Sequence, residues 1–463
     1  MIMARFARLA AVLLLMAMIL GVGAGYAEEE NMDWYFGFGR AQILPDEDSD
    51  QPLYIAGYHN GWEISGVLDY CEARAVWLDT GEDGLLLIGV DCIALDSGTV
   101  GEIREALADL PGCMAVNVYA THTHAGPDTL GLWGPIARNG KNAAYMEALV
   151  RAAEAAGRAA AADRRPGRLA FGKVRTQNMY RDSRLPEIYQ PDLYQLRFAD
   201  NGGGPGLRLL FYGAHAESLR GDNTLLSRDY PGLLCDGVTE ATGDEAMFFP
   251  GAIGGLIMTK AFVSDTTAQA KENLRITGDR LVNYALSIAP EAETPVEAEL
   301  AFVRETFTVP LENPVFLLYK TLGILGNKAV PAESATGVAV ETELSLIRLG
   351  SVTLALIPGE IFPELVYGGK YGNANPEGVN PRPLVEIAAE RGLDTLLIVG
   401  LANDELGYIV PPSDFLVNPR KPYLERIEDD KGEDHYEETN SVGPACAAAV
   451  ADAFEAAVRR LPE

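Results

Sequence analysis

Apolar runs with the length of strands alternate along this chain with longer segments that have helical spacing. Residues 85–90 form a continuous apolar run that ends at an aspartate, as buried strands do. Residues 142–162 are alanine-rich with helical spacing and are followed by a plausible stop, Arg-Arg-Pro-Gly. Residues 342–349 and 352–357 flank Gly350-Ser351 in the manner of a tight hairpin. This mixed order predicts a layered α/β or α+β sandwich, with mixed β-sheets covered by helices.

Length and composition limit the number of domains. A chain of 463 residues, with 48% hydrophobic and 22% charged residues, has the composition of a packed globular protein with one large domain or two ordinary ones. Residues 289–298 are rich in Pro, Glu and Ala and are the best candidate for a seam between two halves. We therefore expect one folded unit over residues 28–463, with a possible seam at 289–298.

The first 27 residues predict export. Arg5 and Arg8 precede an apolar run, and small residues at positions 25 and 27 stand before three glutamates. This pattern is typical of a secretory signal peptide, residues 1–27, that is cleaved after Ala27, and an uncleaved anchor is the alternative. No later segment has the roughly 18 uninterrupted apolar residues of a membrane span. The mature protein is therefore expected outside the cytoplasm, secreted or extracytoplasmic, without a stable membrane span.

Charge and cysteine content exclude several classes of protein. The formal net charge of −29 argues against a nucleic-acid partner, since phosphate binding depends on clustered Lys and Arg. The same charge disfavours electrostatic attachment to an anionic membrane. The five cysteines are scattered without a CxxC pair, which fits neither a disulfide framework nor a zinc ribbon. The sequence leaves the cysteine pairing and the oligomeric state open.

Two of the five histidines fall in the heptapeptide THTHAGP at residues 121–127, directly after an apolar strand. Residues i and i+2 of a strand project from the same face, so His122 and His124 are expected to point into one site. Two such imidazoles suit a metal ligand with a proton-transfer partner, or two metal ligands. A hydrogen-bonded pair without a metal is the alternative, because HxH is a short motif.

Further candidates stand at strand ends and in loops. His215 follows one apolar strand, and Glu360 follows another strand and a Pro-Gly turn. Tyr408 and Tyr436 lie in polar, glycine-containing loops, where functional groups tend to lie. A lone histidine is usually structural and a turn glutamate is usually solvated, so residue type alone leaves these roles open.

Taken together, these segments resemble the catalytic domain of the neutral/alkaline (non-lysosomal) ceramidase family. The most specific match is THTHAGP, beside the family's THTHSGP. The resemblance extends over most of the chain, from about residue 37 to 444, through further matches in the family's order at residues 39–45, 56–58, 72–76, 215–232, 358–360, 408–409 and 436–437. The last two matches stand at a longer spacing than is usual.

The resemblance implies a single zinc ion (Zn2+) held by His122, His215, Glu360 and Tyr408. Two neutral imidazoles and a carboxylate leave open positions for water or a substrate oxygen, which is the pattern of catalytic zinc. A tyrosine ligand would be unusual, because the metal must first lower a phenol pKa that is ordinarily about 10.

The resemblance also implies hydrolysis of an amide, with ceramide or another N-acyl lipid as the substrate. His124 would shuttle the proton to the leaving group, Arg181 would steady developing negative charge, and Tyr436 would donate to an oxyanion. Two alternatives stay open. One is a metal-dependent hydrolase of another amide or ester, and the other is an inactive exported protein that binds lipid or glycan.

Two departures from the family loosen the substrate assignment more than the metal assignment. Residues 254–259 correspond to the family's Gly-Asp-Val-Ser-Pro-Asn, and Ile257 stands where the family has an active-site serine. The chain also ends after one helix, without the family's C-terminal β-sandwich domain. Metal-assisted hydrolysis needs no serine nucleophile, whereas recognition of a sphingoid hydroxyl could need that serine.

Residues 314–326 are the most apolar stretch of the mature chain. Helices that are hydrophobic all round are normally buried, so we expect a core helix here. A groove for an acyl chain is the alternative.

Overall fold

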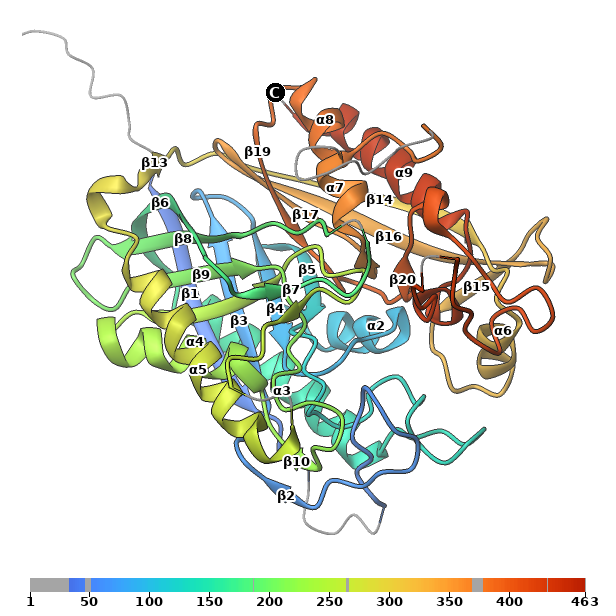
Figure 1. Cartoon of the computed structure of the whole chain (residues 1–463). Coiled ribbons are helices and arrows are strands. Elements are labelled where there is room, and N and C mark those ends of the chain that lie inside the picture. Colours follow the sequence, from blue (N-terminus) through green and yellow to red (C-terminus); the bar gives the residue numbers. More distant parts are fainter. Residues whose placement is uncertain are drawn as a thin grey trace, which may run out of the picture.

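The computed structural model describes residues 33–45, 51–185, 187–263, 266–368, 378–430 and 432–462. The predicted signal peptide, residues 1–27, lies outside these ranges. The described chain forms four layers, because two β-sheets pack face to face and helices cover their outer faces (Figure 1). The predicted sandwich of mixed sheets covered by helices is therefore confirmed.

The first sheet is mixed and runs in the order β11-β9-β8-β6-β1-β3-β4-β5, with β13 paired to β6. The pairs β4–β5 and β9–β11 are parallel, and the other pairs are antiparallel. Its strands are β1 (Trp34–Gln42), β3 (Glu72–Asp79), β4 (Gly84–Val90), β5 (Cys113–Ala120), β6 (Arg165–Arg175), β8 (Asp192–Asp200), β9 (Leu207–Tyr212), β11 (Glu245–Pro250) and β13 (Thr294–Val296).

The second sheet runs in the order β14-β16-β17-β19, with β15 paired to β16. Leu349 lies opposite Val352 in the register of β16 and β17, so the hairpin predicted around Gly350-Ser351 is confirmed. Residues 289–298, the predicted seam, contain β13 of the first sheet and directly precede the second. The strands of the second sheet are β14 (Leu300–Pro310), β15 (Lys328–Pro331), β16 (Val338–Leu349), β17 (Val352–Leu356) and β19 (Thr395–Val399).

A continuous apolar core fills the space between the two sheets. Phe36 and Leu85 of the first sheet belong to the same buried cluster as Ile347 and Leu354 of the second. Burial of strands on both faces explains why residues 85–90 have no polar alternation.

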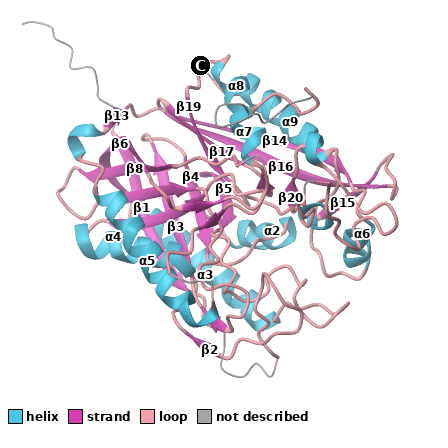
Figure 2. Cartoon of the chain, in the orientation of Figure 1, coloured by secondary structure: helices cyan, strands magenta, loops and turns pink. Residues whose placement is uncertain are grey.

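Helices cover the outer face of the first sheet in two groups, which Figure 2 shows in cyan beside the magenta strands. The N-cap side chain of Asn142 accepts from Tyr145 N and starts α3 close to its predicted position. A Cβ on Gly39 of β1 would lie 2.2 Å from Ala156 O, so glycine there lets α3 lie directly on the strand. The helices on this face are α2 (Ser97–Ala106), α3 (Ala143–Ala162), α4 (Asp229–Thr242) and α5 (Thr267–Leu286).

The outer face of the second sheet is covered mainly by α9. Val450 and Phe454 of this helix belong to one buried cluster with Val303 and Leu344 of the sheet. The helices in this layer are α7 (Pro363–Tyr367), α8 (Leu384–Ala389) and α9 (Cys446–Arg460).

The helix α6 (Pro314–Thr321) contradicts the expectation of a core helix at residues 314–326. None of its residues is buried, and Leu318 and Leu322 are each 52% exposed. Phe316 and Leu317 pack only partly against the nearest core cluster. Sequence apolarity here does not mean burial, because the helix borders a cavity instead of filling the core.

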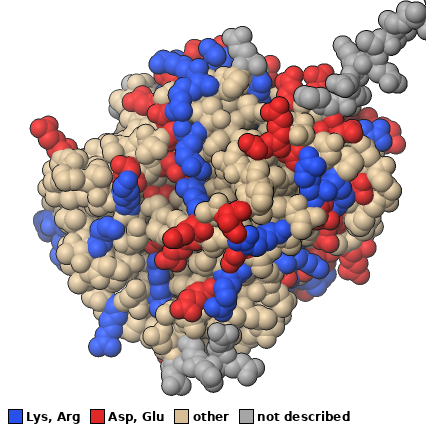
Figure 3. All heavy atoms as spheres, turned by 180° about the vertical axis from the view of Figure 1, so that it is seen from behind, with Lys and Arg blue, Asp and Glu red and all other residues tan. Residues whose placement is uncertain are grey.

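Charged side chains of both signs are interspersed on the face seen in Figure 3. Ion pairs in the molecule include Arg104 with Glu343 and Arg197 with Glu293. Within the described ranges, no helix combines the length and the apolar content that crossing a membrane requires.

Candidate metal centre

A cavity lies where loops from both sheets meet. Most of its lining is apolar and includes Ile93, Leu130, Trp133, Leu311, Phe316 and Leu325. The lining also contains the polar side chains of His122, His124, Lys320, Asn327, Glu360, Glu405, Tyr408, Tyr436 and Asn440. Most of the residues predicted from the sequence therefore share one apolar cavity.

His122 and His124 converge, as predicted, but not through the pleat of a strand. Strand β5 ends at Ala120, and His122 has a φ of 66°, a backbone conformation that non-glycine residues rarely adopt. The Nε2 atoms of His122 and His124 lie 3.1 Å apart. His122 Nδ1 lies 2.7 Å from Ile93 O, which fixes the orientation of its ring. Rare backbone geometry of this kind tends to occur at functional sites.

His215 reaches the same place from the end of β9. Its backbone N–H donates to Ile257 O at 2.7 Å, and its Nδ1 lies 3.0 Å from the same oxygen. The side chain is fully buried, and its Nε2 lies 2.9 Å from Glu360 Oε2. The segment containing Ile257 therefore holds the histidine through its backbone.

Glu360 and Tyr408 are neighbours because two short strands pair in parallel. Strand β18 (Glu360–Ile361) pairs with β20 (Tyr408–Ile409), and the register places Glu360 beside Tyr408. Glu360 Oε2 also lies 3.5 Å from His122 Nε2. Burial alone would raise the pKa of Glu360, but His122 and His215 hold it well below its usual value.

The two predicted tyrosines both line the cavity. Tyr408 is buried, and burial followed by the charge of Glu360 raises the pKa of its hydroxyl well above the usual value. Tyr436 is more exposed, and its ring centroid lies 6.4 Å from that of Tyr408. Tyr408 thus stands beside the carboxylate, and Tyr436 stands nearer to solvent.

Neither Arg181 nor His215 is among the residues that line the cavity, but His215 contacts Glu360 and belongs to the histidine cluster, whereas Arg181 does not. Arg181 is exposed on β7 (Tyr180–Arg181), which pairs with β12 (Met258–Thr259). Arg184, three residues further on, is buried and donates to Glu437 at 2.7 Å and to Glu438 at 2.8 Å. This ion-pair cluster anchors the segment that carries Tyr436, and nothing in the sequence distinguished Arg184 from other arginines.

Ile257, which stands at the position of the family's serine, is buried and does not line the cavity. Thr259 Oγ1 lies 3.2 Å from Ser218 Oγ, and both side chains are buried outside the cavity lining. Within the described part of the chain, no serine or threonine lines the cavity.

Glu405 is a cavity residue that the sequence analysis missed, although the run Asp404-Glu405 in a polar loop was a visible signal. Its Oε1 accepts from Gly407 N at 2.8 Å. Burial, and then the charge of Glu360, raise the pKa of Glu405 well above its usual value.

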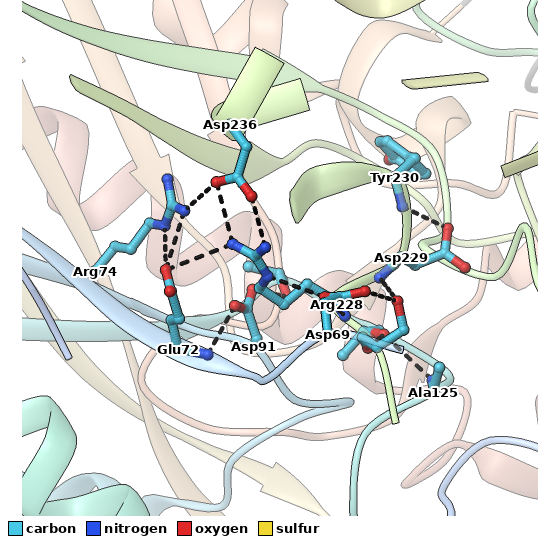
Figure 4. A network of polar contacts seen from close by, with 12 residues as sticks. Asp69, Glu72, Arg74, Asp91, Ala125, Arg228, Asp229, Tyr230 and Asp236 are labelled. Atoms are coloured by element: carbon cyan, nitrogen blue, oxygen red, sulfur yellow. Dashed lines mark hydrogen bonds and ion pairs between the residues drawn. The ribbon is translucent and has the colours of Figure 1, made fainter. Parts of the chain in front are cut away.

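A charged network lies beneath the histidine segments (Figure 4). Arg228 donates to Asp69 at 3.0 Å and to Asp236 at 2.6 Å, and Arg74 also contacts Asp236. Thr121 Oγ1 donates to Asp91 Oδ1 at 3.1 Å, which ties the start of the THTHAGP segment to this region. The network region also reaches the segment that follows His215, because Ser218 N donates to Asp229 Oδ1 at 3.0 Å.

The donor atoms fit a metal ion. One ring nitrogen from each of His122, His124 and His215 lies within 4.8 Å of the others, and all three side chains are buried. This group could hold a metal ion, with Glu360 in contact with two of its members. Imidazole and carboxylate ligands suit zinc among the common protein metals.

No protein-family model matches the chain, and no curated protein sequence matches it. Solved structures with a similar fold include two ceramidases. The first is a neutral ceramidase from Pseudomonas aeruginosa, with a TM-score of 0.70 and 19% sequence identity. The matched region covers 94% of this chain and 76% of the ceramidase chain. The second is a ceramidase complexed with C2, with a TM-score of 0.68 and 18% sequence identity. The matched region covers 92% of this chain and 75% of that ceramidase chain.

These similarities concern the fold, which in this chain is a four-layer sandwich. The particular fold is that of the neutral ceramidases, so the sequence resemblance is confirmed at the level of the fold.

Proposed function

We propose that the protein is an exported, zinc-dependent amidohydrolase that cleaves an N-acyl amide, with N-acyl lipids such as ceramide as the substrate class. The observation that carries this proposal is the contact of Glu360 with both His122 and His215, at an apolar cavity that His122 and Glu360 line. Export rests on the N-terminal sequence alone.

His122, His215, Glu360 and Tyr408 would hold the zinc ion. When bound, zinc supplies Lewis acidity that polarises a carbonyl oxygen and lowers the pKa of water. The two histidines present Nε2 because their Nδ1 atoms face backbone carbonyls. The carboxylate of Glu360 faces both imidazoles and would supply one negative charge toward the divalent cation.

His124 would carry the proton in this reaction. Its Nε2 faces the histidine cluster. At this position Nε2 would accept a proton from the attacking water and then donate that proton to the leaving amine nitrogen. Tyr436 would donate a hydrogen bond to the oxyanion that forms on the acyl carbon. Arg181 is a candidate for stabilising negative charge from outside the cavity lining.

The apolar lining supports an acyl chain as part of the substrate. Transfer of each methylene group from water to such a lining contributes about 0.8 kcal/mol. The surface helix α6 contributes Phe316 to the lining, which favours the acyl-chain groove that the sequence left as the alternative.

The test is hydrolysis of detergent-dispersed N-acyl lipids by the purified mature protein, before and after chelation. We expect release of free fatty acid that is lost on chelation and restored by added zinc. Comparing the hydrolysis rates of the acetylated and the long-chain acylated forms of the same amine distinguishes a preference for lipid amides from a preference for polar amides. Activity that is unaffected by chelation would contradict the proposed mechanism.

One observation favours a second candidate, an exported binding protein. Ile257 occupies the position of the family's serine and offers no hydroxyl. Such a protein would retain an N-acyl lipid without releasing fatty acid, and the same assay reports that outcome.

A further inference from the structure

The three histidines at the cavity differ in what faces their Nδ1 atoms. His122 Nδ1 and His215 Nδ1 face backbone carbonyls at 2.7 and 3.0 Å. His124 Nδ1 is buried and has no hydrogen-bond partner among the described residues. The charged group that faces it is the carboxylate of Glu217, whose Oε2 lies 3.8 Å away.

Glu217 is buried and has acceptor capacity to spare. Its Oε2 accepts a hydrogen bond from the Tyr58 hydroxyl. Arg220 Nη1 lies 3.8 Å from its Oε1, and that oxygen has no hydrogen-bond partner within the described ranges. A carboxylate offers about four acceptor positions, and buried carboxylates are normally well satisfied. Glu217 is therefore able to accept a further hydrogen bond from an N–H group nearby.

The chain around Gly57 presses directly on the ring of His124. Gly57 has a φ of 110°, and a Cβ at this position would lie 2.5 Å from His124 Nδ1. The next residue, Tyr58, packs edge-on against the same ring with centroids 5.4 Å apart. The loop that supplies the hydroxyl to Glu217 thus also restricts the movement of His124.

We propose that Glu217 is a positioning residue that orients His124. Its carboxylate accepts a hydrogen bond from Nδ1–H of His124, which leaves Nε2 unprotonated and facing the cavity, and the Tyr58 hydroxyl holds the carboxylate in place. A movement of about 1 Å converts the separation of 3.8 Å into a normal hydrogen bond. Such bonds are often long before substrate binds. The inference rests on the proposed function in one respect, the role of His124 as the proton carrier.

This arrangement distinguishes His124 from the other two histidines. A carbonyl oxygen holds the Nδ1–H of His122 or His215 and has no formal charge. A carboxylate does the same for His124 and also stabilises the positive charge that appears when Nε2 takes up a proton. His124, the histidine that faces a carboxylate, is therefore the one suited to a proton-transfer role.

The decisive variant is Glu217→Gln, which keeps the shape of the side chain. Tyr58 and His124 both face the position of Oε2, and the Arg220 guanidinium faces Oε1. Because a guanidinium can only donate, the amide oxygen is expected to face Arg220, which places the amide NH2 toward the Tyr58 hydroxyl and His124 Nδ1. His124 Nδ1 would then have to accept, and its proton would move to Nε2. We expect kcat to fall at least tenfold with KM within about twofold, because an imidazole in the wrong tautomer is a poor base.

The tautomer is read directly from nitrogen NMR of the zinc-loaded protein labelled on its five histidines. In the wild type we expect His124 to carry its proton on Nδ1, and in Glu217→Gln on Nε2. Adding Arg220→Met to Glu217→Gln frees the amide to turn its oxygen toward the Tyr58 hydroxyl and His124, so this double variant should regain the Nδ1 proton and part of kcat. In a His124→Asn background, Glu217→Gln should cause no further loss of kcat.

The matched control is Glu240→Gln, the same substitution at an exposed position of α4, which should leave the spectrum and kcat unchanged. A proton that stays on His124 Nδ1 in Glu217→Gln would overturn the inference. The spectrum needs no substrate. A tautomer switch in a protein that hydrolyses no N-acyl amide would refute the proposed function and leave the orientation by Glu217 standing.

Discussion

His215 Nε2 lies 2.9 Å from Glu360 Oε2, although 145 residues separate them in the sequence. His215 follows β9 of the first sheet, and Glu360 follows β17 of the second. The contact therefore exists only because the two sheets pack face to face. The candidate metal centre lies at the junction of the two sheets, and its integrity depends on both.

Metal content tests this junction. We expect about one zinc ion per chain in the wild type, and loss of that ion in both His215→Ala and Glu360→Ala, since each removes a ligand from a different sheet. Elemental analysis after dialysis gives the ratio. Asp79→Asn, a buried carboxylate change away from the cavity, is the control and should keep the metal. Full zinc content in either ligand variant would show that the ion binds elsewhere.

Phe316→Ala tests the acyl-chain groove. Phe316 lines the cavity, so its removal should raise KM for a long-chain N-acyl substrate by about five- to tenfold and leave the acetylated form of the same amine nearly unchanged. Leu318→Ala is the matched control, because this residue of the same helix is 52% exposed and is not among the residues that line the cavity. Equal effects on long and short substrates would argue against the groove.

Arg184→Met tests the buried ion-pair cluster below Tyr436. Loss of the guanidinium leaves Glu437 and Glu438 buried without their cation, which should lower the free energy of unfolding by about 3 kcal/mol. Urea unfolding measures this change. Arg426→Met removes an exposed pair with Asp434 and should cost less than about 1 kcal/mol.

The pH dependence of stability should reflect Glu364. Burial raises the pKa of this carboxyl to about 8, with further contributions from Asp182 and Asp414. The folded state therefore holds a proton that the unfolded state has released, so stability falls as pH rises from about 4.5 to about 8. Glu364→Gln cannot ionise and should lose this part of the slope. Urea unfolding at pH 5, 6.5 and 8 compares the two proteins, and identical slopes would refute the assignment.

Export predicts a defined N-terminus. Expression of the full chain in a bacterial host with a secretion pathway should yield a mature protein that begins at Glu28, because the small residues before this position fit signal peptidase. Intact mass of the exported protein measures the cleavage site. A membrane-bound product that keeps residues 1–27 would instead support the uncleaved anchor.

Much of the architecture follows from local patterns. The apolar run at residues 85–90, the alanine-rich segment at 142–162 and the hairpin at Gly350-Ser351 all form the predicted elements. These features depend on neighbours in the sequence, through strand burial, helix capping and turn geometry. The THTHAGP segment likewise marked the place where His122 and His124 converge, although the backbone there leaves the strand.

Other features depended on contacts that no local pattern encodes. The apolar segment 314–326 was expected in the core, but α6 lies at the surface beside the cavity. Arg181 stays outside the cavity lining, whereas Arg184 is drawn into a cluster with carboxylates about 250 residues away. Side-chain partners at such separations are set by how the layers pack.

The sequence by itself therefore determined the order of strands and helices and the residue types available for a metal centre. Only the tertiary structure decided which of these residues meet. Periodicity records which face of an element is buried, because burial repeats with the element's own geometry. The meeting of His215 with Glu360, and of His124 with Glu217, depends instead on the position of one sheet or loop against another, which has no periodic trace in the sequence.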